Sequence, residues 1–187
     1  MRRLLPIAFL LLALAGAGCR RPLAGAVYLA PGLPFRLCPP ETGPEFFAIQ
    51  ELTFGFPGGR RETAVAAIEN KGGNLSVVAS TPLGQTLFTV QVRGRAVTVD
   101  ARMPLPSGLD PALLPALVQF SLWPEAALRA GLEPGVRLEQ DGPRRTLLLR
   151  GRAVWTVTRD GAAAPFKGLM LENPAMGLSV RIRTLEE

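Results

Sequence analysis

The sequence predicts a mainly β protein in which antiparallel strands form one curved sheet and only two short helices interrupt them. Three observations lead to this prediction. First, 20 Gly and 18 Pro are spread without a period through 187 residues, which favours many turns over long helices. Second, apolar and polar residues alternate with period two on both sides of short glycine turns, as in antiparallel strands with one face in water. Third, helical periodicity is confined to the middle of the chain.

Residues 1–18 have the pattern of an export signal. Two arginines near the start are followed by an apolar run and then by small residues up to Cys19. Arg20 and Arg21 end this run before it reaches the roughly 18–25 apolar residues that span a bilayer, so a permanent transmembrane helix is not expected. The segment resembles a bacterial lipoprotein signal, in which the cysteine becomes the acylated first residue. An ordinary secretory signal followed by a chance cysteine is the alternative.

Residues 19–44 are rich in proline and show little periodicity, so we expect them to form a tether between the lipid and the domain. Once Cys19 is acylated, Cys38 has no intramolecular partner. We expect Cys38 to be a buried free thiol, with intermolecular pairing as the alternative. The folded domain is then expected to span residues 45–187.

The domain contains about nine or ten strand-like runs. They include Phe46–Phe56, Thr63–Asn70, Leu75–Ser80, Gln85–Asp100 (divided by a turn at Gly94-Arg95), Arg145–Leu149, Trp155–Arg159, Lys167–Glu172 and Gly177–Leu185. Lys71–Asn74 is a strong hairpin turn between two of these runs. The five residues Arg93–Val97 recur as Arg150–Val154, again between strand-like runs. A duplicated hairpin would explain the repeat. A coincidence is favoured, because glycine with flanking arginines is common in turns.

Two helices are expected between the two groups of strands, over Asp110–Phe120 and Pro124–Ala130. Asp110 and Pro111 have the residue types of an N-cap and a first helical position. Apolar residues then recur at helical spacing along the first helix, and Pro115 is expected to kink it.

A family resemblance is carried by several of these segments. They are Leu87–Val90, Met103–Pro106, Leu117–Pro124 followed by Ala127-Leu128, and the final strand with Asn173 and Gly177. Over most of residues 45–185 they resemble a family of bacterial outer-membrane lipoproteins, described mainly as a domain of unknown function. Its genes often lie beside genes for aryl-polyene or related fatty-acid-like biosynthesis. That family is in turn similar to the periplasmic lipoprotein carrier LolA and the outer-membrane receptor LolB.

The LolB-like resemblance implies a half-open antiparallel β-barrel of about 9–11 strands, with two short helices as a lid over an apolar cavity for acyl chains. The side chains expected to line that cavity are Phe88, Val90, Leu117, Phe120, Trp123, Leu147 and Trp155. For the two tryptophans, filling a solid core is the competing interpretation.

Catalysis is not expected from this composition. The chain has no His and two Cys, which excludes Ser-His-Asp and Cys-His nucleophile pairs and His metal sites. The candidate acids form no close pair on a shared face; they are Glu51, Glu62, Asp100, Asp110, Glu125 and Asp160. No catalytic residue, cofactor or metal is therefore predicted. The basic residues are scattered and nearly all Arg, so nucleic-acid binding is not predicted either.

The sequence therefore predicts a lipoprotein held by Cys19 on the periplasmic face of the outer membrane of a Gram-negative bacterium. Arg20, rather than Asp, after the cysteine implies the outer membrane. The expected activity is binding, or help in transferring, a hydrophobic acyl or polyene ligand. A periplasmic carrier or a biosynthetic protein is the expected partner. The alternative is a non-catalytic scaffold lipoprotein of a cell-envelope complex.

Overall fold

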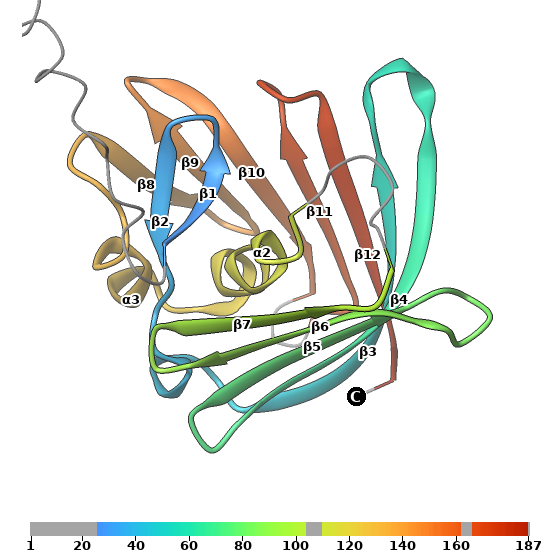
Figure 1. Ribbon diagram of the computed structural model, residues 1–187. Helices are drawn as coiled ribbons and strands as arrows, with labels where there is room; N and C mark the ends of the chain where they lie inside the picture. The colour runs from blue at the N-terminus through green and yellow to red at the C-terminus, as the bar shows by residue number, and fades with distance from the viewer. Residues whose placement is uncertain (1–25, 104–109, 162–165, 187) are drawn as a thin grey trace, which may run out of the picture.

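The computed structural model describes residues 26–103, 110–161 and 166–186 (Figure 1). The strands are β1 (Ala26–Ala30), β2 (Leu33–Arg36), β3 (Phe46–Gly55), β4 (Arg61–Lys71), β5 (Asn74–Ser80), β6 (Thr86–Arg93), β7 (Ala96–Ala101), β8 (Val136–Asp141), β9 (Arg144–Leu149), β10 (Arg152–Asp160), β11 (Gly168–Asn173) and β12 (Leu178–Glu186). The helices are α2 (Leu113–Leu122) and α3 (Glu125–Arg129), and short 3-10 turns lie at Pro40–Thr42 and Pro57–Gly59. None of the helices in these described ranges has the length and apolar character needed to cross a membrane.

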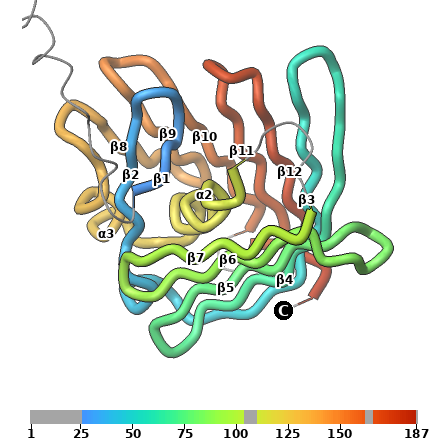
Figure 2. Tube along the Cα trace, viewed as in Figure 1, coloured from blue at the N-terminus to red at the C-terminus, as the bar shows by residue number. Residues whose placement is uncertain are grey.

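Ten of the strands form one antiparallel sheet in the order β7-β6-β5-β4-β3-β12-β11-β10-β9-β8. Two five-stranded meanders, β3–β7 and β8–β12, are joined where the last strand pairs with β3. The sheet curves around helix α2 and stays open, with β7 and β8 at its edges (Figures 1 and 2). The predicted fold class, a mainly β curved antiparallel sheet with two short helices, is confirmed.

Helix α2 lies inside the concave face of the sheet and contacts β5 and β10 on the sheet and β1 of the small hairpin. Eight of its ten residues are buried. A helix enclosed in this way must be apolar almost all round, which explains the nearly uncharged sequence from Leu113 to Trp123.

Residues 26–44 are part of the domain, whereas a tether is predicted for residues 19–44. Strands β1 and β2 form a hairpin whose apolar side chains are buried: Val27, Leu29, Leu33 and Phe35, followed by Leu37. In a tether these side chains would face water. Here they cover one half of the concave face, because that half otherwise exposes the inner side of β9 and β10 and one side of α2.

Buried polar side chains hold this N-terminal segment in place. The carbonyl of Leu29 accepts hydrogen bonds from Trp155 Nε1 at 2.6 Å and from Asn173 Nδ2 at 3.3 Å. Farther along, Asn70 Nδ2 donates to the carbonyls of Pro40 and Pro44. Each bond joins the segment to a distant strand of the large sheet, and together they satisfy backbone carbonyls that the hairpin buries.

Gln119 on α2 makes a two-point connection to the same segment. Its Oε1 accepts from the Cys38 backbone N–H and its Nε2 donates to the Cys38 carbonyl, both at 2.8 Å. The Cys38 side chain is buried and its thiol is free, as predicted, and its Sγ donates to the Ala127 carbonyl. The segment Leu117–Pro124, which carries part of the family resemblance, therefore places Gln119 against Cys38 and the Trp123 ring against Gly43.

Helix α2 begins three residues later than predicted and shows no break at Pro115. Asp110 initiates a preceding turn, in which its Oδ1 accepts the Ala112 N–H at 2.9 Å. Because α2 starts at Leu113, Pro115 falls in its first turn, where the backbone N–H has no partner within a helix. The predicted kink is therefore wrong.

The repeated pentapeptide adopts two different registers. In the first copy Arg93 pairs with Ala96, so the turn is Gly94-Arg95; in the second Leu149 pairs with Arg152, so the turn is Arg150-Gly151. Arg150 consequently takes a positive φ of 52°, the left-handed conformation that Gly94 takes in the first copy. The two hairpins are not structural duplicates, in agreement with the favoured interpretation.

Candidate apolar ligand cleft

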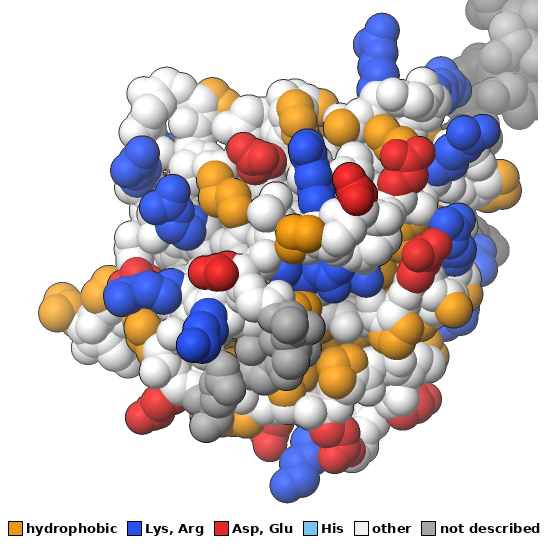
Figure 3. Space-filling view, turned by 180° about the vertical axis from the view of Figure 1, so that it is seen from behind, with side chains coloured by type: hydrophobic (Ala, Val, Ile, Leu, Met, Phe, Trp, Pro, Cys, Tyr) orange, Lys and Arg blue, Asp and Glu red, His pale blue; other side chains and the backbone are white. Residues whose placement is uncertain are grey.

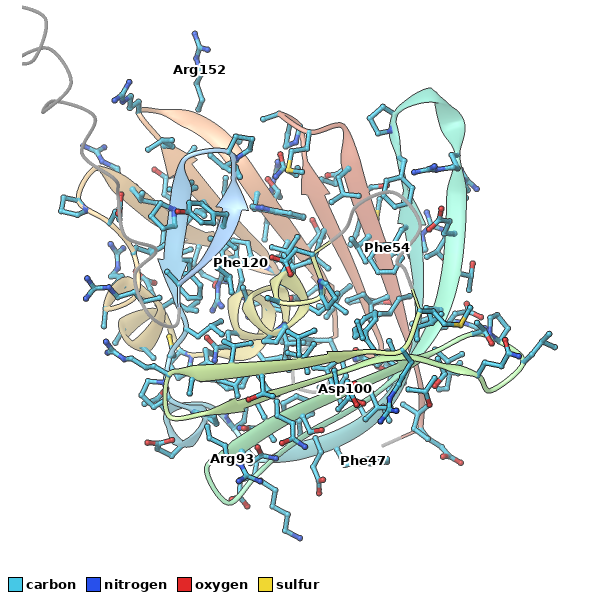
Figure 4. All side chains as sticks on the ribbon, in the orientation of Figure 1. Phe47, Phe54, Arg93, Asp100, Phe120 and Arg152 are labelled. Atoms are coloured by element: carbon cyan, nitrogen blue, oxygen red, sulfur yellow. The ribbon has the colours of Figure 1, made fainter. Side chains whose placement is uncertain are left out.

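An unfilled apolar space lies at one end of the concave face. It is formed where the inner sides of β3, β4, β5 and β6 meet the first turn of α2, and its volume is about 230 Å³. Its apolar lining consists of Leu52, Phe54, Phe56, Ala64, Ala79, Leu87, Phe88 and Leu114; Glu62, Thr63 and Thr81 are its polar residues. We call this space the inner cleft. Phe54 points into the molecule from β3 (Figure 4), and its ring stacks on Phe56 with centroids 6.3 Å apart.

A second, wider space adjoins the inner cleft and shares Phe56 with it. Its volume is about 510 Å³, and we call it the mouth. Three turns frame it: the β1–β2 turn with Pro31, the β3–β4 turn with Pro57, and the β11–β12 turn with Met176. Tyr28 and Met176 at this rim are 54% and 41% exposed. Exposed large apolar side chains around an apolar opening are typical of ligand-binding surfaces.

Three charged residues line these spaces, Arg60 and Asp110 at the mouth and Glu62 in the inner cleft. At the mouth, Arg60 lies over the Phe56 ring, with its guanidinium carbon 4.7 Å from the ring centroid. Its Nε lies 3.6 Å from Oε1 of Glu62, which lines the inner cleft. Asp110 also lines the mouth, where its side chain caps the turn before α2. An apolar chain in the inner cleft would meet apolar walls, while a polar head at the mouth would meet charged groups and water.

Of the seven side chains predicted to line a cavity, the structure places Phe88 in the inner cleft. The other six are buried in the interior and line neither space: Val90, Leu117, Phe120, Trp123, Leu147 and Trp155. Trp123 and Trp155 are both 0% exposed, so they fill core rather than guard an opening. For the two tryptophans the physical reason is the N-terminal segment that covers them: the Leu29 carbonyl on β1 accepts the Trp155 indole N–H, and Gly43 lies against the Trp123 ring.

Apart from Phe88, sequence reasoning missed the residues that line the inner cleft, chiefly Phe54 and Phe56. A signal was available in the aromatic run of Phe46–Phe56, which ends at Pro57 and two glycines. The periodicity places Phe54 on the buried face of a strand. It cannot say that the space in front of Phe54 is left unfilled, because that depends on which segment covers it.

The six candidate acids lie on different elements. Glu51 is on the outer face of β3, Glu62 lines the inner cleft, and Asp100 on β7 pairs with Arg102 at 2.7 Å. Asp110 precedes α2, Glu125 pairs with Arg129 on α3, and Asp160 ends β10. Within the described ranges no group of three or more His, Cys, Asp or Glu is placed to hold a metal ion. Residues 1–18 and Cys19 lie outside the described residues.

The fold and the site together define a class of protein: an open antiparallel sheet curved around a helix, with an apolar cleft at one end. The chain belongs to the family described as "Protein of unknown function (DUF3261)", whose pattern matches residues 48–186. Among solved structures, it is similar to the "LolA superfamily protein NE2245 from Nitrosomonas europaea". The identity is 11%, the TM-score is 0.47, and the match covers 79% of this chain and 88% of that one. No curated protein matches the sequence.

Proposed function

We propose that this protein is an outer-membrane lipoprotein, anchored through Cys19, that holds a hydrophobic acyl or polyene ligand in the inner cleft. The observation that supports it most is the inner cleft itself, an unfilled space of about 230 Å³ whose lining is mostly aliphatic and aromatic. Empty apolar space in a protein interior loses packing energy, so a space of this size is better occupied by an apolar ligand than left empty.

The shape of the site favours a chain-like ligand with a polar end. The inner cleft has a volume of about 230 Å³ and a mostly apolar lining, and it adjoins a mouth of about 510 Å³ where Arg60 and Asp110 lie. The apolar end of such a ligand would lie against Phe54 and Leu114, and its head would remain at the rim. Handing the ligand to a periplasmic carrier or a biosynthetic protein would need this mouth to face the partner. The export signal, the acylation cysteine and the family resemblance support the proposed location.

The ligand proposal is tested by titrating the full chain with cis-parinaric acid, a fluorescent polyene fatty acid. Ala64→Phe would fill the inner cleft, and Ala67→Phe adds the same ring on the outer face of the same strand, where Ala67 is half-buried. We expect Ala64→Phe to weaken binding about tenfold or more and Ala67→Phe to leave it within about twofold. Any binding by residues 1–18 is common to all variants.

If Ala64→Phe fails to fold, Phe56→Asp gives an independent test, because Phe56 is half-buried and lines both the inner cleft and the mouth. Equal affinity in wild type, Ala64→Phe and Phe56→Asp would overturn the ligand proposal. A stoichiometric protein partner captured without any copurifying lipid would then favour the scaffold function.

Anchoring is tested separately with Cys19→Ser. We expect this variant to lose acylation and to be unprocessed or released from the outer membrane. Recovery of the processed variant in the outer membrane would contradict the proposed anchor.

A further inference from the structure

The convex side of the sheet carries a second hollow, on the face opposite the inner cleft. It lies where β12, β3 and β4 run side by side and its volume is about 380 Å³. Arg181 is paired with Thr53, and Gly55 is paired with both Ser179 and Arg61. The next residues along the strands, such as Leu52, Phe54 and Val180, are buried, so the paired set faces outward. We call this space the convex hollow.

The floor of the convex hollow is made of small residues. Gly55 and Ser179 lie opposite each other, and a Cβ atom on Gly55 would stand only 2.5 Å from Ser179 Oγ. The long side chains of Arg61 and Arg181 flank this floor. A flat sheet surface is thereby turned into a depression with cationic walls and two hydroxyl groups, from Thr53 and Ser179.

The charge in the convex hollow is unbalanced. It is lined by three arginines and one acid, and Arg183 Nη2 is paired with Glu51 Oε1 at 3.2 Å. Arg61 and Arg181 make no ion pair or side-chain hydrogen bond with any other residue in the described ranges. Figure 3 shows the molecule from behind, where Lys and Arg side chains are spread over the surface with Asp and Glu side chains and uncharged surface among them. Two uncompensated guanidinium groups around one depression repel each other, and an anion between them would remove that repulsion.

We propose that the convex hollow binds a phosphate group. Arginine forks and hydroxyl donors that approach from several sides match the oxygens of a tetrahedral oxyanion, whereas a single carboxylate is satisfied by one fork. The phosphate belongs either to a lipid head group or to a small free phosphate compound. The convex hollow lies on the opposite face of the sheet from the inner cleft, so the phosphate proposal does not depend on the proposed lipid ligand.

The test is isothermal titration calorimetry of the full chain, held in an uncharged detergent. The two probes are inorganic phosphate and glycerophosphoglycerol. The second is a phospholipid head group, and it carries no acyl chains, so it cannot bind through the inner cleft as a lipid would. The binding variant is the double substitution Arg61→Gln and Arg181→Gln. The matched control is Arg152→Gln, which removes an exposed arginine that extends into solvent at the β9–β10 turn (Figure 4). All the substituted side chains are exposed, so thermal unfolding should be unchanged.

We expect the double variant to bind about tenfold more weakly than wild type, and Arg152→Gln to bind within about twofold. Binding of both probes with this pattern supports the proposal and assigns a lipid head group. The same pattern with inorganic phosphate alone supports it with a free phosphate compound as the source. Absence of binding at millimolar concentration, or equal losses in the double variant and the control, overturns it.

Discussion

Replacing Arg145 with methionine tests whether one buried cation fixes the end of helix α2. Arg145 on β9 is 5% exposed. Its Nη1 donates to the carbonyls of Phe120 at 2.7 Å and Trp123 at 2.9 Å, and its Nε donates to Gln140 Oε1 at 3.0 Å. Both carbonyls lie at the C-terminal end of α2, where a helix leaves its last carbonyls unpaired and its dipole is negative.

The expected loss follows from what the substitution leaves behind. A hydrogen bond from a charged donor contributes about 1.5–3 kcal/mol net, and methionine leaves two buried carbonyls without this donor. Against this, the protein no longer buries a guanidinium. Burial lowers the pKa of Arg145 to about 10, with nearby Arg159 adding to the shift, so burying the charge is unfavourable. We therefore expect the free energy of unfolding to fall by about 2–3 kcal/mol, compared with about 0.5 kcal/mol or less for exposed Arg152→Met.

The assay is urea unfolding followed by the fluorescence of the two buried tryptophans. Arg145→Lys should give an intermediate loss, because an ammonium keeps the charge but not the planar fork. Arg145 stays protonated in the folded and unfolded states well below pH 10, so the loss should be the same at pH 6 and pH 8. Unfolding of Arg145→Met within about 0.5 kcal/mol of wild type would refute the reasoning, since it would mean that the helix end needs no such donor.

Three further expectations, at Gly43, at Cys38 and at the two repeated turns, rest on the same structure. Gly43→Ala should lower the unfolding free energy by about 3 kcal/mol, because the new methyl would overlap the ring of buried Trp123. A melting temperature equal to wild type would show that the ring can move. Burial raises the pKa of the Cys38 thiol from 9.0 to about 11. The stability that the protonated thiol contributes is therefore fully present below pH 9 and lost as the pH rises toward 11. The urea midpoints of wild type and Cys38→Ala should therefore differ at pH 8 and lie closer together at pH 10.5. Arg150→Gly should raise the free energy of unfolding by up to about 1 kcal/mol, because it relieves a positive φ. Arg93→Gly, at the matching position of the first copy, should lower it by a similar amount because it weakens a strand. Changes of the same sign in urea unfolding would contradict the two registers.

Local pattern was enough to predict much of the sheet. The alternation in Thr63–Asn70 and Leu75–Ser80, with glycines between them, predicts the β4–β5 hairpin, and both turn glycines take the required positive φ. Neighbouring strands share a short turn, so their pairing is decided by a few adjacent residues. The β1–β2 hairpin escaped prediction because the prolines of residues 19–44 resemble a linker, although apolar residues alternate within the hairpin itself.

The position of the inner cleft could not be predicted from local sequence patterns, for a different reason. Periodicity tells which side of a strand faces the interior, and it placed Phe88 and Val90 there correctly. Whether interior space is filled or empty depends on what lies opposite. Trp155 is covered because Leu29, 126 residues away in the sequence, accepts its indole N–H. Phe54 has no such cover, and the space in front of it remains open.

The sequence by itself determined the secondary structure class, the two short helices, and most strands with their inward and outward faces. These follow from the spacing of apolar residues and from turn chemistry, which act over a few residues. Only the tertiary structure decided that β12 pairs with β3, that residues 26–44 belong to the core, and that the open space lies beside Phe54 and Phe56. Those features rest on contacts between segments far apart in the chain, and such contacts depend on complementary shape and on hydrogen bonds such as those of Gln119 and Asn173.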